Sequence, residues 1–100
     1  MAYVNALTAL ADPTRRAVFE RLRGGGRSVG EIAKDLPVSR PAVSQHLKAL
    51  KDAGLVTDEA RGTARIYRIH APGLVELRTY LESFWDDALQ NFKAYAEDEK

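Results

Sequence analysis

Apolar residues recur along most of this chain at the three- and four-residue spacing that places them on one face of an α-helix. The pattern predicts a first helix over residues 3–11. A second helix is expected to begin at Asp12-Pro13, an N-cap followed by proline, and to stop at the glycines of residues 24–26. A third opens at Ser28 with a capping-box pattern, in which glutamate follows three residues later.

A fourth helix is predicted to begin at Ser39, an N-cap that lies only about three or four residues after the third helix. A connection of that length is typical of a helix-turn-helix corner. Gly54 ends the helix. Its buried stripe is expected to consist of Val43, Leu47 and Leu50.

The next segments alternate like strands, over residues 55–57 and 64–69, with an exposed charged turn predicted over residues 58–63. From Pro72 a long helix is predicted to reach Glu97. The resulting fold class is mainly α with a small β-hairpin, in the order helix, helix, helix, helix, hairpin, helix. Three helices followed by a hairpin with a basic tip are the layout of a winged helix-turn-helix.

Composition changes this picture mainly through charge. The chain has 100 residues, enough for a single domain over residues 1–100, and no cysteine, which excludes disulfides and thiolate metal sites. Residues 1–70 carry twelve Lys/Arg against seven Asp/Glu, or +5, and residues 71–100 carry three against seven, or −4. This asymmetry indicates a basic surface that faces a polyanion. No apolar run is long enough for a membrane span and no signal-peptide pattern opens the chain, so we expect a cytoplasmic location.

The polar face of the fourth helix is expected to enter the major groove of DNA, which admits one α-helix. Ser44 and Gln45 lie where side chains reach base edges, and glutamine can bind adenine through two hydrogen bonds. Arg40 and Lys48 flank them and are assigned mainly to phosphates, with a guanine contact left open for Arg40. Ser39 is first an N-cap whose hydroxyl could also contact phosphate. The alternative is an ordinary solvated helix face.

Other residues of the predicted DNA-binding surface lie in the hairpin and the first turn of the fourth helix. Arg61, Thr63 and Arg65 form the tip of the wing, where arginine is attracted by the negative potential of a narrow minor groove. Pro41 leaves the backbone of the first turn of the fourth helix accessible where it approaches DNA, although proline is also simply tolerated in a first turn. Arg15 and Arg16 could contact phosphate or pair with acidic residues, and both alternatives stay open.

Three segments in order resemble the ArsR/SmtB family of bacterial transcriptional repressors: ADPTRRAVFERL, SVGEIAKDLPVSRPAVSQHLKALKDAGLV and ARGTARIYRIH. The resemblance covers roughly residues 5–72. It implies a winged-helix homodimer that represses by occupying operator DNA and is released by a signal. It also adds His46, which by its position is a core-edge residue, as a phosphate contact.

The resemblance divides the chain into a helix-turn-helix and wing core, residues 12–70, and two dimerisation helices, residues 1–11 and 72–97. The apolar stripe of the last helix supports this division, because it continues past the point where one small domain could cover it. The predicted interface consists of Leu7, Leu10, Leu77, Leu81, Phe84, Trp85, Ala88 and Phe92.

The sequence departs from the metal-sensing members of that family. The positions that match their cysteine pattern hold Ser28 and Gly30, and residues 72–100 contain no histidine. With two histidines in the chain and no cysteine, neither a metal site nor a cofactor is expected. The carboxylates of the last helix lack a nearby nucleophile or glycine loop, so the chain is not expected to be an enzyme.

The sequence therefore predicts a homodimeric repressor that binds double-stranded operator DNA, does not sense metal and does not contact a membrane. An activator on the same scaffold stays open, as does a winged-helix protein-protein interaction module without DNA binding. The inducing signal is also open, between a small-molecule effector and simple abundance. The order of the last few residues is a further open question.

Overall fold

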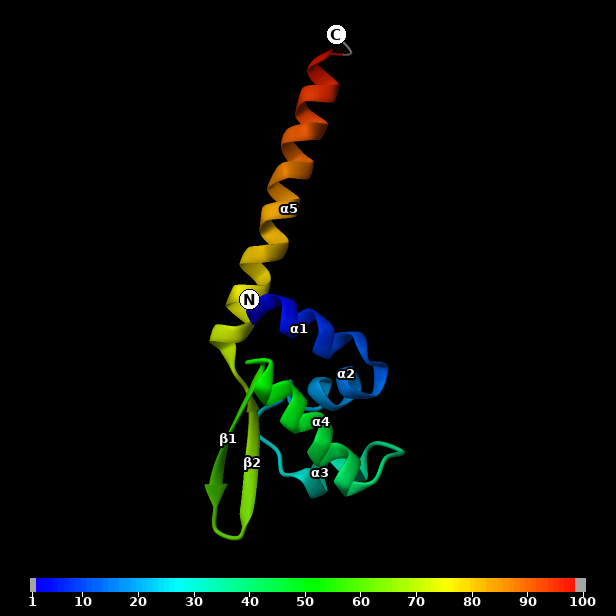
Figure 1. Ribbon diagram of the computed structural model, residues 1–100, viewed down its shortest axis with the longest axis vertical. Helices are drawn as coiled ribbons and strands as arrows, with labels where there is room; N and C mark the ends of the chain where they lie inside the picture. Colours follow the sequence, from blue (N-terminus) through cyan, green and yellow to red (C-terminus); the bar gives the residue numbers. More distant parts are fainter. Residues whose placement is uncertain (1, 99–100) are drawn as a thin grey trace.

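The computed structural model describes residues 2–98, and its long dimension comes from one projecting helix. Figure 1 shows α1 to α4 gathered into one body, with the hairpin at its lower end and α5 extending away at the other. The principal extents are 66 × 25 × 23 Å. The elements are α1 (Ala2–Ala11), α2 (Pro13–Glu20), α3 (Val29–Lys34), α4 (Arg40–Asp52), β1 (Val56–Arg61), β2 (Ala64–Ile69) and α5 (Ala71–Asp98). This order confirms the predicted fold class. Met1, Glu99 and Lys100, part of the predicted domain, lie outside the described residues.

Side chains at the helix starts explain why the helices begin where the sequence predicts. Asp12 and Ser39 each accept a hydrogen bond from the backbone N–H three residues further on. Ser28 and Glu31 make both hydrogen bonds of the capping box, at 3.2 and 3.0 Å. These bonds satisfy N–H groups that have no partner within the helix. The three predicted N-caps are therefore confirmed.

The core is built around α4, which contacts each of α1, α2, α3 and β1. The apolar stripe predicted for α4 is buried in this core, while α1 contributes Ala6 and Ala9 and leaves Val4 and Leu7 exposed. The largest fully buried side chains are Leu22, Ile32, Leu47, Leu50, Leu55, Val18 and Val43.

Two helix boundaries differ from the prediction by more than one residue. The second helix ends at Glu20 and not at the glycines, because the N–H groups of Arg21, Leu22 and Arg23 bond to carbonyls three residues back and tighten the chain into a turn. The connection between α3 and α4 covers residues 35–39, longer than predicted, since α3 already ends at Lys34.

The hairpin is longer than the sequence indicated. β1 continues to Arg61, so the predicted turn over residues 58–63 is wrong for all but its last two residues, Gly62 and Thr63. Gly62 has φ +62°, which places glycine at the first position of a type II′ turn. Arg61 pairs with Ala64 across this turn in an antiparallel register. Charged residues that favour a turn by composition are thus part of a strand.

The first turn of α5 is fixed to the body by close backbone packing. The N–H of His70 donates to the carbonyl of Leu55 at 2.8 Å. Gly73 lies so close to the carbonyl of Gly54 that a Cβ there would overlap the oxygen. Leu77 is buried in the same core cluster, and α1 packs along this part of α5. Between residues 2 and 98, no helix combines the length and the apolar character of a bilayer span.

Candidate nucleic-acid interface

The α4 helix presents two contrasting faces. Val43, Leu47 and Leu50 have no exposed surface and fix the helix to the body. On the other side Ser44 and Gln45 are exposed, and they lie within the helix, with helical residues before and after them. Polar groups held by a rigid, buried stripe are pre-oriented for a ligand that can approach the helix from solvent.

Basic side chains stand at both ends of this exposed face. Lys48 lies 4.0 Å from Asp52, a contact between two largely exposed groups and therefore of little energetic weight. The guanidinium of Arg40 lies over Gly30, where an added Cβ would be 3.2 Å from Nη2. The exposed Pro41 occupies the first turn, directly after Arg40. α3 and α4 thus pack closely at the end of the helix nearest Arg40.

His46 lies at the edge of the core, half-buried, and its buried Nδ1 atom has no hydrogen-bond partner among the residues that the structure describes. The backbone N–H of Arg15 is the main reason that the pKa of Asp12 is lowered, with the charges of Arg15 and His46 adding to it. The position agrees with the core-edge interpretation of His46, and a phosphate contact stays a prediction.

The two faces of the wing each carry one carboxylate that binds two basic side chains. On one face Asp58 lies 2.8 Å from Nζ of Lys51, at the end of α4, and 3.1 Å from Nη1 of Arg65. The Asp58 side chain is only 8% exposed. The hydrogen bond from Lys51 is the largest cause that holds the pKa of Asp58 below its ordinary value, with Arg65 adding to it against the effect of burial.

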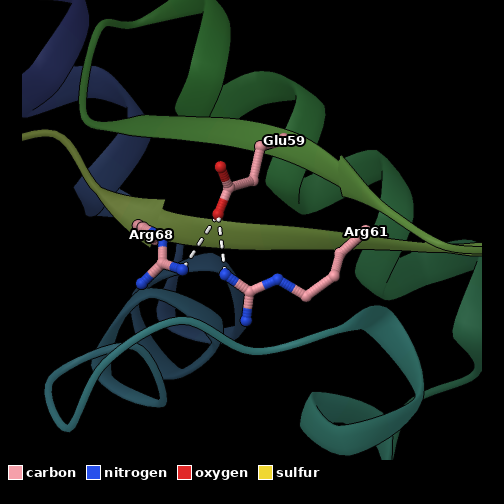
Figure 2. Close-up of polar contacts among 3 residues, drawn as sticks. All are labelled: Glu59, Arg61 and Arg68. Carbon is pink, nitrogen blue, oxygen red and sulfur yellow. Dashed lines mark hydrogen bonds and ion pairs between the residues drawn. The ribbon is translucent and has the colours of Figure 1, made fainter.

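On the other face Glu59 binds two arginines through a single oxygen (Figure 2). Its Oε1 atom accepts from Nη2 of Arg68 at 3.0 Å and from Nη2 of Arg61 at 3.3 Å. Arg68 is the main cause of the lowered pKa of Glu59, so this carboxylate is ionised at neutral pH. All three side chains are well exposed to solvent.

A groove of about 470 Å³ lies between the start of α3, the start of α4 and the tip of the wing. Lys34, Arg40, Thr63 and Arg65 contribute to its lining. These residues come from three elements that are separate in the sequence, so the fold brings predicted contacts of the helix and of the wing to one concave surface. Lys34 was not among the predicted contacts.

The structure places the predicted DNA-binding residues on the α4 face and along the wing, but it does not leave the wing arginines unpaired. Arg61 and Arg65 are each bound by a carboxylate of β1. The sequence analysis missed Arg68 and Lys51, which complete these two clusters. Alternation along β2 places Arg68 on the same face as Ile66, but its partner is set by the register with β1 and is not visible in local sequence.

A second surface, along α1 and α5, is apolar. Trp85 and Phe92 are 65% and 69% exposed, and Val4 and Leu7 of α1 are exposed as well. A groove of about 670 Å³ on α5 is lined by residues from Ala71 to Trp85. Of the predicted interface residues, Leu77 is buried in its own chain's core and Leu10 is half-buried. The exposed ones are Leu7, Leu81, Phe84, Trp85, Ala88 and Phe92.

The positions that match the cysteine pattern of the metal-sensing family members hold Ser28 and Gly30. Ser28 is engaged in the capping box and Gly30 has no side chain. Over residues 2–98, no group of three His, Cys, Asp or Glu side chains is arranged to hold a metal ion.

Comparison with known proteins gives consistent matches over most of the chain. Residues 10–59 match a family described as a helix-turn-helix domain. The chain is 59% identical over 87 residues to the HTH-type transcriptional regulator Rv2034 of Mycobacterium tuberculosis, and the match covers 87% of this chain and 81% of that protein. It is 32% identical over 80 residues to the transcriptional repressor SdpR of Bacillus subtilis, with coverage of 80% and 89%.

A solved structure agrees with the fold. The solution structure of the homodimeric winged helix-turn-helix DNA-binding domain of Mb0332 from Mycobacterium bovis, a possible ArsR-family regulator, superposes with a TM-score of 0.69. The two chains are 29% identical, and the match covers 90% of this chain and 83% of that one.

Proposed function

The chain belongs to the ArsR/SmtB family of winged helix-turn-helix transcriptional regulators, and we propose that it is a homodimeric repressor that binds operator DNA without sensing metal. One observation carries the proposal more than any other. The polar face of α4 is exposed while the opposite face of the same helix is fully buried, and a basic wing lies beside it. A DNA-binding repressor acts at the chromosome, so the proposal includes a cytoplasmic location.

In this proposal α4 reads the major groove. Gln45 and Ser44 contact base edges, and one bidentate pair is worth about 1–3 kcal/mol of discrimination against the wrong base. Arg40 and Lys48 contact phosphates on either side, which fixes the position of the helix but carries no sequence information. Ser39, Pro41 and His46 lie where α4 would meet the backbone of the DNA.

The wing contacts the adjacent minor groove through Arg61, Thr63 and Arg65. The groove shared by the wing, α3 and the start of α4 supports this part of the proposal, because three basic side chains line it against one carboxylate, Glu31, and basic groups bind the sugar-phosphate backbone. Lys34 and Arg40 line that surface and add sequence-independent affinity.

The homodimer forms through α1 and α5. Burial against a second copy removes exposed apolar surface on α5 that its own chain does not cover. A two-fold arrangement of α5 would place two α4 helices about one DNA turn apart, roughly 34–36 Å, on a near-palindromic site. Both Mb0332, a homodimer, and SdpR, a repressor, support this assembly and direction of regulation.

The proposal leaves the release signal open between an unidentified small-molecule effector and simple abundance. Metal is excluded from it because the side chains at the matching positions, Ser28 and Gly30, cannot serve as strong ligands. We propose no catalytic activity for the chain.

Fluorescence anisotropy with the DNA upstream of its own gene tests the proposal, with a shuffled duplex, two salt concentrations and a chelator. We expect tight, salt-sensitive and sequence-selective binding that the chelator leaves unchanged. Gln45→Ala should weaken operator binding about 5- to 150-fold while leaving shuffled DNA unaffected. Gln90→Ala, at an exposed position opposite the apolar stripe of α5, is the matched control and should bind like the parent protein.

Two results would redirect the proposal. Equal, weak binding to both duplexes would call for selection from random sequences, because the operator would lie elsewhere. If no duplex bound even at low salt, a protein-protein interaction module would replace the repressor. A reporter fused to the bound promoter distinguishes repression from activation.

A further inference from the structure

We propose that Glu59 competes with DNA: it binds Arg61 and Arg68 in the free protein and must be displaced before these arginines can bind the minor groove and the phosphates that border it. The inference rests on the proposed function and deepens it in two ways. It adds Arg68 to the DNA-binding surface, and it gives an acidic residue of the wing the role of limiting sequence-independent affinity.

The geometry brings the three side chains to one face of the hairpin (Figure 2). In the antiparallel register Glu59 lies opposite Ile66, and Arg68 lies two pairs further along, opposite Thr57. Residues two apart on a strand share a face, so Arg61 lies on that face as well. A carboxylate oxygen that accepts from both guanidinium groups occupies the position that a phosphate oxygen would take.

The side chain of Arg68 is also confined by the backbone at Gly26. At Gly26 an added Cβ would lie 2.7 Å from Cγ2 of Ile66 and 2.9 Å from Nη1 of Arg68, so the side chain of Arg68 lies across this glycine. The Glu59 oxygen and the Gly26 backbone together hold Arg68 near the surface of the wing. It is 43% exposed and can therefore exchange one anionic partner for another without leaving its place.

Asp58 gives the contrasting case within the same strand. Its side chain is 8% exposed and has a 2.8 Å contact with Lys51, which makes it part of the attachment between the wing and α4. Glu59 is 52% exposed, and ion pairs between exposed groups contribute little to stability. The Glu59 pairs are therefore replaceable by phosphate, and the Asp58 pairs are not.

Displacing Glu59 reduces the counterion release that the wing gains from DNA, because the arginines are already partly neutralised. Replacing Glu59 by glutamine should tighten binding to operator and shuffled DNA by the same factor, about three- to tenfold at low salt. The slope of log affinity against log salt should become steeper by about 1, the contribution of one further phosphate contact.

The experiment measures anisotropy titrations of the parent protein and E59Q at four salt concentrations, with operator and shuffled duplexes. The same substitution is repeated in a chain that already carries Arg61→Ala and Arg68→Ala. Without these arginines E59Q should have no further effect. Glu20→Gln, an exposed acidic residue of α2, controls for the general gain from removing a negative charge. Urea midpoints of all variants control for folding.

Several outcomes would overturn the inference. E59Q that binds DNA unchanged or more weakly would show that Glu59 orients the arginines and does not compete with DNA. Equal tightening by E59Q with and without the two arginines, or by Glu20→Gln, would reduce the effect to net charge. Each of these results leaves operator binding by the parent protein intact. Failure of the proposed function would instead appear as loss of sequence selectivity in the parent protein itself.

Discussion

Two regions of this chain differ in whether their own chain buries their apolar side chains. Among the described residues, all fully buried apolar side chains lie between α1 and the first turns of α5, a region in which only Val4, Leu7 and Val75 of the large apolar side chains are exposed. From Leu81 to Asp98, every residue is exposed, including Phe84, Trp85 and Phe92. The first region has a core of its own, while the second has an apolar stripe that no described part of its own chain covers. The hydrophobic spacing of a helix therefore predicts that its apolar stripe is buried, but not which chain covers that stripe.

The largest effect is expected where the first region is most closely packed. Leu47→Ala removes a side chain with no exposed surface and should lower the free energy of unfolding by about 2–5 kcal/mol, by lost transfer energy and a residual cavity. Urea denaturation followed by circular dichroism measures it. Leu89→Ala, the same change at a 51% exposed site, is the comparison. Its cost should shrink as the protein is diluted, because the contact with the partner that the substitution weakens is lost when the protomers dissociate. Equal, concentration-independent losses would remove the distinction between the regions.

The next effect concerns the second copy of the chain that we propose covers the exposed part of α5. Trp85→Glu places a charge on the exposed apolar surface of α5 and should raise the dimer dissociation constant at least about 30-fold, as expected for a central aromatic residue of an interface. Sedimentation equilibrium measures it. Gln90→Glu, on the opposite face of the helix, should leave the constant unchanged. A monomeric parent protein would refute the assignment of α5.

How much of this could be read from the sequence depends on the range of the interactions involved. The helix starts at Asp12, Ser28 and Ser39 were predictable because a cap and the N–H that it accepts are three residues apart. The two faces of α4 followed from helical spacing in the same way. Local chemistry was sufficient for both.

The wing could not be predicted in this way. Asp58 and Glu59 have low strand propensity, and composition alone favours a turn. Their strand conformation is supported by partners that are distant in sequence, such as Lys51 and Arg68, and by the hairpin register. The exposed site on α4 was therefore predictable residue by residue, while the ion pairs of the wing required the tertiary structure.

The junction of the two regions gives a smaller effect. Gly73→Ala should cost about 1–3 kcal/mol, because the new Cβ would overlap the carbonyl oxygen of Gly54 and backbone must move to admit it. This outcome reverses the usual preference of a helix for alanine over glycine. Gly24→Ala is the control, since its Cβ would meet only Arg27 at 3.7 Å. If both variants unfolded at the same urea concentration, the contact between α5 and the body would be looser than the structure shows.

The smallest effect is on the pH dependence of stability, which should change with a substitution in the wing but not with one on exposed α5. The pKa of Asp58 is lower in the folded protein than its ordinary value of about 4, mainly through Lys51. The stabilisation is therefore complete above that ordinary value and is lost as pH falls through it toward the lowered pKa. Between pH 7 and pH 3, Asp58→Asn should flatten the fall of the urea midpoint, because the substituted side chain no longer titrates. Asp86→Asn, on exposed α5, should leave that fall as it is in the parent protein. An unchanged pH profile in Asp58→Asn would mean that the attachment of the wing to α4 does not depend on this carboxylate.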